Sequence, residues 1–353
     1  MTNQEILEAF LHKIDEHSHR VEDLPALDEW IRKARKYVGL DVQSIREGLS
    51  REGILSLILY DINRYINESD WSGAEAQFQL FDEMTRGRKV SADFLFMRWY
   101  RSAEVYRRKG QLDKALDSTH QAERYAEGHE MRFRLYFLRG EIESADRNRY
   151  EFSVNSLSLA LYEAEQLGER YEAKVYTKLA HMFSMRYASL GMYFLRKAQV
   201  LGCRLGDQDI LLDNKFTMAE SYTVMAQIHP KDEQLFLEEA GRVLSTIDYE
   251  SLPLPQNKMY YREIQGKINR DVDILAEVCA YYQRTDAVNA VCRLCDLIIE
   301  IGVNNQQIKK ILPYIDLYRC MAKRRNSCRL AEELEHIRQV EDIVNGILAE
   351  QAQ

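Results

Sequence analysis

Arginine and lysine side chains are concentrated in one segment of the chain, where aromatic residues lie among them. Between Arg86 and Lys109 the sequence has eight basic residues and only two acidic residues, although the whole chain has a formal net charge of −8. The basic residues are Arg86, Arg88, Lys89, Arg98, Arg101, Arg107, Arg108 and Lys109. Because guanidinium groups bind carboxylates through paired hydrogen bonds, this segment predicts a surface for an acidic protein or peptide. The alternative is a solvated helix face whose long side chains cover apolar surface.

Cysteine and histidine spacing gives two weak metal signals. Cys292 and Cys295 form one C-x-x-C, but no second pair follows at the spacing of a zinc site, and both residues fit one face of a helix. Buried packing residues are therefore the favoured interpretation. His12 and His19 would share a helix face with acids between them, which could bind a metal, but a solvated polar face is favoured there too.

Catalytic motifs are not found in the sequence, which has no glycine-rich phosphate loop, no G-x-S-x-G elbow and no H-E-x-x-H pair. We therefore expect no enzyme and no cofactor or metal.

The net charge of −8 makes nucleic acid an unlikely partner, because proteins that bind nucleic acid generally present a positive electrostatic field to its phosphates. No apolar run approaches the roughly 20 residues of a membrane span. We expect no membrane contact, a cytoplasmic location and six reduced cysteines.

The helices that would position these residues repeat along the chain. Residues 99–122 read W-Y-R-S-A-E-V-Y-R-R-K-G-Q-L-D-K-A-L-D-S-T-H-Q-A. Ala103 would let two helix backbones approach closely, and Gly110 would end the first helix, because glycine adopts a positive φ without strain. Ala115 and Ala122 would then lie two turns apart on one face of the second helix.

The small or packing residue that marks each helix recurs at a nearly constant period. First-helix marks are separated by 41, 38, 39 and 39 residues, at Ile62, Ala103, Glu141, Ala180 and Ala219. Second-helix marks are separated by 38, 38 and 42 residues, at Ala122, Ala160, Ala198 and Ala240. Most copies place an aromatic residue three positions after the first mark, but the Glu141 copy has Ser144 there. Only 16 glycines and 5 prolines in 353 residues also favour an all-α fold.

This pattern resembles the tetratricopeptide repeat family, in which helix–turn–helix units of about 34 residues stack into solenoids. The resemblance implies a right-handed α-solenoid of antiparallel helix pairs, with helical caps at both ends. It also implies a concave groove lined by the first helix of each pair. The candidate partner-binding residues are Arg98, Tyr100, Arg101, Glu104, Arg107, Arg108, Lys174, Thr177, His181, Ser184 and Met185.

Three segments are expected along the chain. Residues 1–50 would form an N-terminal helical cap from Asn3–Ser18 and Leu24–Val38, residues 51–250 the repeat array, and residues 258–353 further repeats and a capping helix. Ser251–Asn257 carries two of the five prolines and is the candidate break. The last helix has an apolar stripe from Leu330 to Ile347, which favours packing onto the preceding helix as a cap. The alternatives are formation of a homodimer and a connection to an output domain.

Three function classes follow from this sequence. The first is a non-catalytic scaffold that binds a protein or peptide in the groove. The second is a regulator, because a helical cap followed by divergent repeats is similar in layout to bacterial Rap-type proteins, which bind response regulators and signalling peptides. The third is the sensor portion of a longer signalling or transcription protein.

Overall fold

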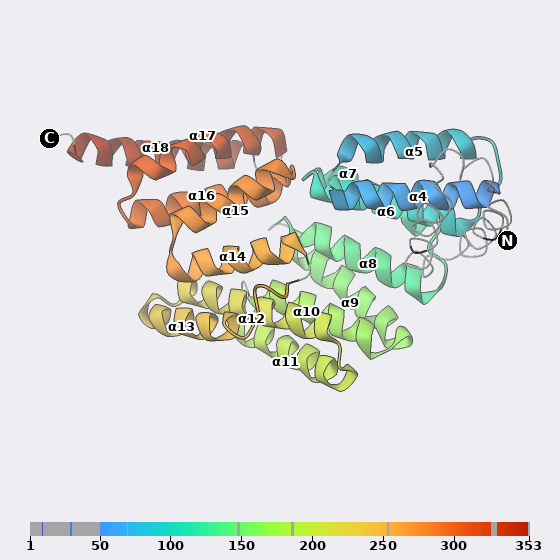
Figure 1. Ribbon diagram of the computed structural model, residues 1–353, viewed down its shortest axis with the longest axis horizontal. Coiled ribbons are helices and arrows are strands. Elements are labelled where there is room, and N and C mark those ends of the chain that lie inside the picture. The colour runs from blue at the N-terminus through green and yellow to red at the C-terminus, as the bar shows by residue number, and fades with distance from the viewer. Residues whose placement is uncertain are drawn as a thin grey trace. The chain divides into compact units, whose positions relative to one another are not determined.

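The structure is a computed structural model that describes Ala9, Glu29 and residues 50–68, 70–146, 149–184, 187–252, 254–325 and 330–351. These residues form fifteen α-helices, one short 3-10 helix and their connections, and none of them lies in a β-strand (Figure 1). The all-α prediction is therefore confirmed for the described part of the chain. The expected helices Asn3–Ser18 and Leu24–Val38 lie outside it, except for Ala9 and Glu29.

The chain divides into two compact units. One contains residues 1–107 and 112–139, and the other contains residues 108–111 and 140–353. The division falls inside a helix, α8 (Gly128–Ser144). The candidate break at Ser251–Asn257 lies within the second unit, and its last three residues are the first three of the helix that begins at Pro255.

The first unit has a core rich in phenylalanine. Its described helices are α4 (Arg51–Glu68), α5 (Trp71–Thr85), α6 (Ala92–Arg108), α7 (Leu112–Glu123) and the first part of α8. The Asp70 side chain accepts a hydrogen bond from the Gly73 backbone N–H at 2.9 Å, which satisfies one of the free donors at the start of α5. Phe81 of α5, Phe96 of α6 and Leu135 of α8 are fully buried in this core.

The small residues that mark the repeat are buried as predicted. Ala103, Ala115 and Ala122 have no exposed surface, and Gly110 has a φ of 75° just after α6. The same is true of the alanine marks in the second unit, Ala160, Ala180, Ala198, Ala219 and Ala240. First-helix and second-helix marks fall on alternating helices from α6 to α13, so the sequence period corresponds to sequential helix pairs.

The second unit continues this pairing. Its helices after α8 are α9 (Tyr150–Leu167), α10 (Glu169–Ser184), α11 (Ala188–Leu205), α12 (Gln208–Ile228), the 3-10 helix η3 (Pro230–Asp232), α13 (Glu233–Leu244), α14 (Pro255–Asn269), α15 (Val272–Arg284), α16 (Val288–Asn304), α17 (Ile308–Arg325) and α18 (Leu330–Gln351). Consecutive helices pack against each other in antiparallel-like pairs, as in α10 with α11, α12 with α13 and α16 with α17. Asp207 and Asp271 cap the starts of α12 and α15 by accepting backbone N–H bonds.

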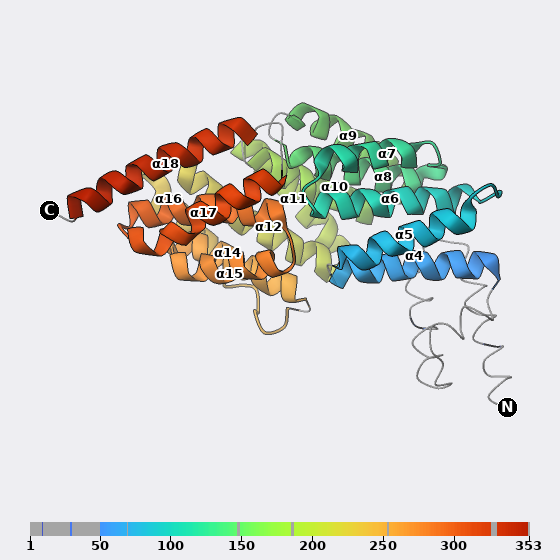
Figure 2. The ribbon, with the colours of Figure 1, turned by 90° about the horizontal axis from the view of Figure 1, so that it is seen from above.

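The C-terminal end of the second unit has its own apolar core. Ile337 and Val344 of α18 are buried in it, and α18 lies along α17 (Figure 2). Cys279, Cys292 and Cys295 belong to the same core, and burial raises the pKa of the Cys292 thiol to about 11. The predicted packing role of Cys292 and Cys295 is thus confirmed. Homodimer formation through α18 stays a prediction.

The described helices contain no segment that is both long enough and apolar enough to span a bilayer.

Candidate functional site

Two of the arginines predicted to bind a partner, Arg98 and Arg101, are paired with carboxylates of their own unit. Arg98 on α6 donates to both carboxylate oxygens of Asp82 on α5, at 3.0 and 2.6 Å. Its guanidinium carbon also lies 3.9 Å from the Trp99 ring centroid. The Asp82 side chain is 50% exposed, whereas that of Arg98 is 12% exposed. An acidic partner would therefore have to compete with Asp82 for Arg98.

A second pair lies one turn further along α6. Arg101 and Glu104 are 2.5 Å apart, and both side chains are mostly buried. Burial alone would lower the pKa of Arg101, but the Glu104 carboxylate outweighs this effect and raises it. Tyr100 stacks on Phe96, with ring centroids 5.8 Å apart. Arg107 and Arg108 are half-buried at the end of α6.

The second predicted group lies on α10, and the hydroxyls of two of its members, Thr177 and Ser184, bond to α12. The Thr177 hydroxyl donates to Asn214 Oδ1 at 2.8 Å, and the Ser221 hydroxyl donates to Ser184 Oγ at 2.7 Å. Ser184 is buried, so it is not available to a partner.

The other members of the α10 group lie differently. His181 Nδ1 is 3.3 Å from a carboxylate oxygen of Glu220. Lys174 is exposed and opposes the burial that raises the pKa of the Asp213 carboxyl. Met185 lies outside the described residues. Whether this group or the group on α6 binds a partner stays a prediction.

Glu220 belongs to a cluster of charged groups that could not be identified from the sequence. Lys267 on α14 places Nζ 2.9 Å from Glu220 Oε1 and 2.8 Å from Glu263 Oε1. Arg293 on α16 donates to both oxygens of Glu263, with Nη2 2.9 Å from Oε2. The Tyr260 hydroxyl donates to Glu220. This ionic cluster links α12, α14 and α16 through two carboxylates and two cations.

Burial and charge act in opposite directions on these groups. The Glu263 side chain is completely buried, which alone would raise its pKa. The charges of Arg293 and Lys267 outweigh burial and lower the pKa of Glu263 to about 2. Burial likewise opposes ionisation of Glu220, but Lys267 holds the pKa of Glu220 well below its usual range. Burial and the neighbouring Glu220 raise the pKa of Tyr260. Both carboxylates are therefore ionised at neutral pH.

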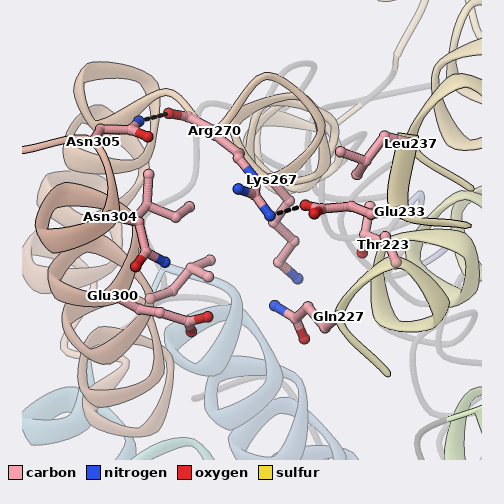
Figure 3. Close-up of a pocket in the computed structure, with 12 residues that line it drawn as sticks. Thr223, Gln227, Glu233, Leu237, Lys267, Arg270, Glu300, Asn304 and Asn305 are labelled. Carbon is pink, nitrogen blue, oxygen red and sulfur yellow. Dashed lines mark hydrogen bonds and ion pairs between the residues drawn. The ribbon is translucent and has the colours of Figure 1, made fainter. Parts of the chain in front are cut away.

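A polar pocket opens beside this cluster, and Lys267 belongs to both (Figure 3). Its cavity volume is about 40 Å³, which is enough for a few water molecules or the polar head of a ligand. Twelve residues from α12, α13, α14, α16 and the turns after α14 and α16 line it: Thr223, Ala226, Gln227, Glu233, Leu237, Lys267, Arg270, Leu297, Glu300, Ile301, Asn304 and Asn305.

The polar side chains of this pocket are of two kinds. Arg270 pairs with Glu233, and Asn305 Nδ2 donates to the Arg270 carbonyl at 3.0 Å, so these groups are already bonded. Gln227, Glu300 and Asn304 are exposed and have no side-chain partner among the described residues. Figure 3 shows them extending from α12 and α16 toward the same space. The pocket thus offers two carboxamides and one carboxylate to a ligand.

The sequence contained little that could have identified this pocket. Glu263 and Lys267 are four residues apart, a spacing that predicts an ion pair on a helix surface rather than a buried one. Glu300 and Asn304 share a helix face for the same reason. Of the predicted residues that the structure describes, only His181 contacts the ionic cluster.

Neither a comparison with protein-family models nor a comparison with curated proteins found a match to this chain. The candidate site therefore rests on the geometry of the pocket and the ionic cluster.

Proposed function

We propose that this chain is a non-catalytic module that binds a protein or peptide, and that the pocket between α12, α14 and α16 is part of its binding surface. The observation that carries this proposal is a set of three polar side chains, Gln227, Glu300 and Asn304, which have no side-chain partner in the described part of the chain and lie beside a cluster whose own charges are paired. We also propose that the helix pairs form a right-handed solenoid of the tetratricopeptide type.

The chemistry of the lining suits recognition. A carboxamide carries both a donor and an acceptor, so Gln227 and Asn304 can each bond a peptide main chain in either direction. The ionic cluster behind them holds three helices together, which reduces the ordering required when a ligand binds. Among the twelve lining residues the single hydroxyl, that of Thr223, donates to the Glu220 carbonyl at 2.8 Å.

Panning of a random peptide library tests this proposal. Peptides enriched on the wild-type protein should bind the double variant Gln227→Ala/Asn304→Ala at least roughly tenfold more weakly, because two hydrogen-bonding side chains are lost. The matched control is Asn155→Ala/Gln166→Ala, which removes the same side chains from exposed positions of α9. Enriched peptides that bind both double variants equally, or a failure of enrichment, would contradict the proposal.

The signalling roles rest on this binding activity. We propose a cytoplasmic regulatory or signalling adaptor; the alternatives are a Rap-like regulator and the sensor portion of a longer protein. The five described cysteines are free thiols, which fits a reducing compartment.

A further inference from the structure

The charged groups of the pocket and of the ionic cluster do not all form ion pairs with one another. The carboxylates are Glu220, Glu233, Glu263 and Glu300, and the cations are Lys267, Arg270 and Arg293. Lys267 and Arg293 neutralise Glu220 and Glu263, while Arg270 neutralises Glu233. His181 Nδ1 also lies 3.3 Å from a carboxylate oxygen of Glu220, on the side of the ionic cluster. One negative charge, that of Glu300, is therefore left without a cation partner among the described residues.

The groups next to Glu300 match the other needs of an amine. Asn304 follows Glu300 by one helical turn, and Gln227 reaches the same space from α12. Their carboxamide oxygens can accept the N–H groups of an ammonium ion that the carboxylate does not use. Leu237, Leu297 and Ile301 supply apolar lining for methylene groups. A carboxylate, two amide oxygens and an apolar wall together suit a primary alkylammonium group.

We propose that the pocket binds a primary alkylammonium group, with Glu300 as its counter-ion and the carboxamides of Gln227 and Asn304 as further acceptors. This inference rests on the proposed function, because it names the chemistry that the binding surface selects. An anionic group is disfavoured, since Lys267 and Arg270 are already held by carboxylates while Glu300 would repel it. The ammonium group could come from a lysine side chain in a peptide or from a free alkylamine.

Calorimetric titration of the whole chain with four probes tests this inference. The probes are n-butylamine, the capped tripeptide acetyl-Gly-Lys-Gly-amide, the same tripeptide acetylated on its lysine amine, and glutarate as an anion. We expect saturable binding of the two amines and none of the acetylated peptide or glutarate. Tighter binding of the lysine peptide identifies a peptide as the source, and equal binding identifies a free amine.

The variant Glu300→Gln isolates the charge, because glutamine keeps the size of the side chain. Binding of both amines should weaken roughly tenfold or more, as expected when a hydrogen bond to a charged group is lost. The control Glu151→Gln removes the same charge from an exposed position of α9 and should leave binding unchanged. Unchanged amine binding in Glu300→Gln, or binding of glutarate in place of the amines, overturns the inference.

The two proposals fail separately. If library peptides require Gln227 and Asn304 but no amine binds, the ammonium site is wrong and the peptide-binding proposal stands. If n-butylamine binds through Glu300 while no peptide is enriched, the peptide-binding proposal fails and the pocket is a site for small amines.

Discussion

Glu263 on α14 and Arg293 on α16 form a two-point ion pair in which the carboxylate is completely buried and half of the arginine side chain is exposed. Lys267 approaches the same carboxylate from within α14. Removing the carboxylate would therefore break the ion pair of Arg293 and leave Lys267 with Glu220 alone, which makes Glu263 the most direct test of the ionic cluster.

Glu263→Gln should lower the free energy of unfolding by about 3 kcal/mol, at the low end for a broken buried pair because Arg293 keeps some contact with solvent. Urea denaturation measures the effect. The control is Glu277→Gln, which breaks a partly exposed pair with Arg262 and should cost less than about 1 kcal/mol. Equal effects of the two substitutions would show that the cluster does not hold the helices together.

Stability should fall in acid because the folded state lowers the pKa of Glu263 from 4.5 to about 2. The unfolded state binds the proton more readily, so the stabilisation is complete above about pH 4.5 and is lost as the pH falls toward 2. A pKa difference of this size corresponds to about 3 kcal/mol. Urea denaturation at pH 7, 4 and 2.5 should show this loss in the wild-type protein. The dependence should be smaller in Glu263→Gln, and an identical acid profile would contradict the assignment.

Gly191→Ala should destabilise the contact between α10 and α11. A Cβ atom at Gly191 would lie 2.8 Å from the Ser184 backbone nitrogen and closer still to its hydroxyl, so backbone has to move. We expect a loss of about 1–3 kcal/mol, as for overpacked interiors. Gly346→Ala in α18 has open space around its new Cβ and should stabilise by up to about 1 kcal/mol. Thermal unfolding of both variants checks the difference in sign.

Ala103→Leu tests the repeat register in the first unit. Ala103 is completely buried, so the larger side chain should overpack its surroundings and cost about 1–3 kcal/mol. Ala331→Leu places the same change on an exposed position of α18 and should stay within about 0.5 kcal/mol of the wild type. An unchanged melting curve for Ala103→Leu would contradict the assigned register.

Asp82→Asn tests whether the arginines of α6 bind an acidic partner. The substitution releases Arg98 from its internal carboxylate, so a glutamate-rich peptide used as the probe should bind more tightly than to the wild type. The double variant Arg98→Glu/Arg108→Glu should weaken binding by about 2–5 kcal/mol if the charge pairs are desolvated. Affinities that do not change in either variant would identify this group as a solvated helix face.

The helices could be predicted because their signals are local or periodic. Ala103, Ala180 and Ala219 recur at one period, and each is fully buried on the first helix of a pair. Gly110 was predicted from the conformational freedom of glycine, and it has a positive φ. These features depend on a residue and its neighbours in sequence, so they can be predicted from the composition and the spacing of residues.

The roles of individual polar residues could not be predicted in the same way. Thr177 and Ser184 were expected to face a partner, but they hold α12. Arg98 was a candidate for binding an acidic partner, and the structure pairs it with Asp82, sixteen residues earlier in the sequence. Each outcome depends on which side chain a neighbouring helix brings within hydrogen-bonding distance.

The sequence by itself determined that the described chain is helical, that its helices pair in order and that small residues lie where they pack. Only the tertiary structure decided that Glu220, Glu263, Lys267 and Arg293 meet, and that Glu300 beside them has no cation partner within the described ranges. Helix formation and close packing follow from spacings of a few residues, whereas the energy of an ion pair depends on the distance in space between the two charges. Glu220 and Lys267 are 47 residues apart in sequence, and only the packing of α12 against α14 brings their charges to 2.9 Å.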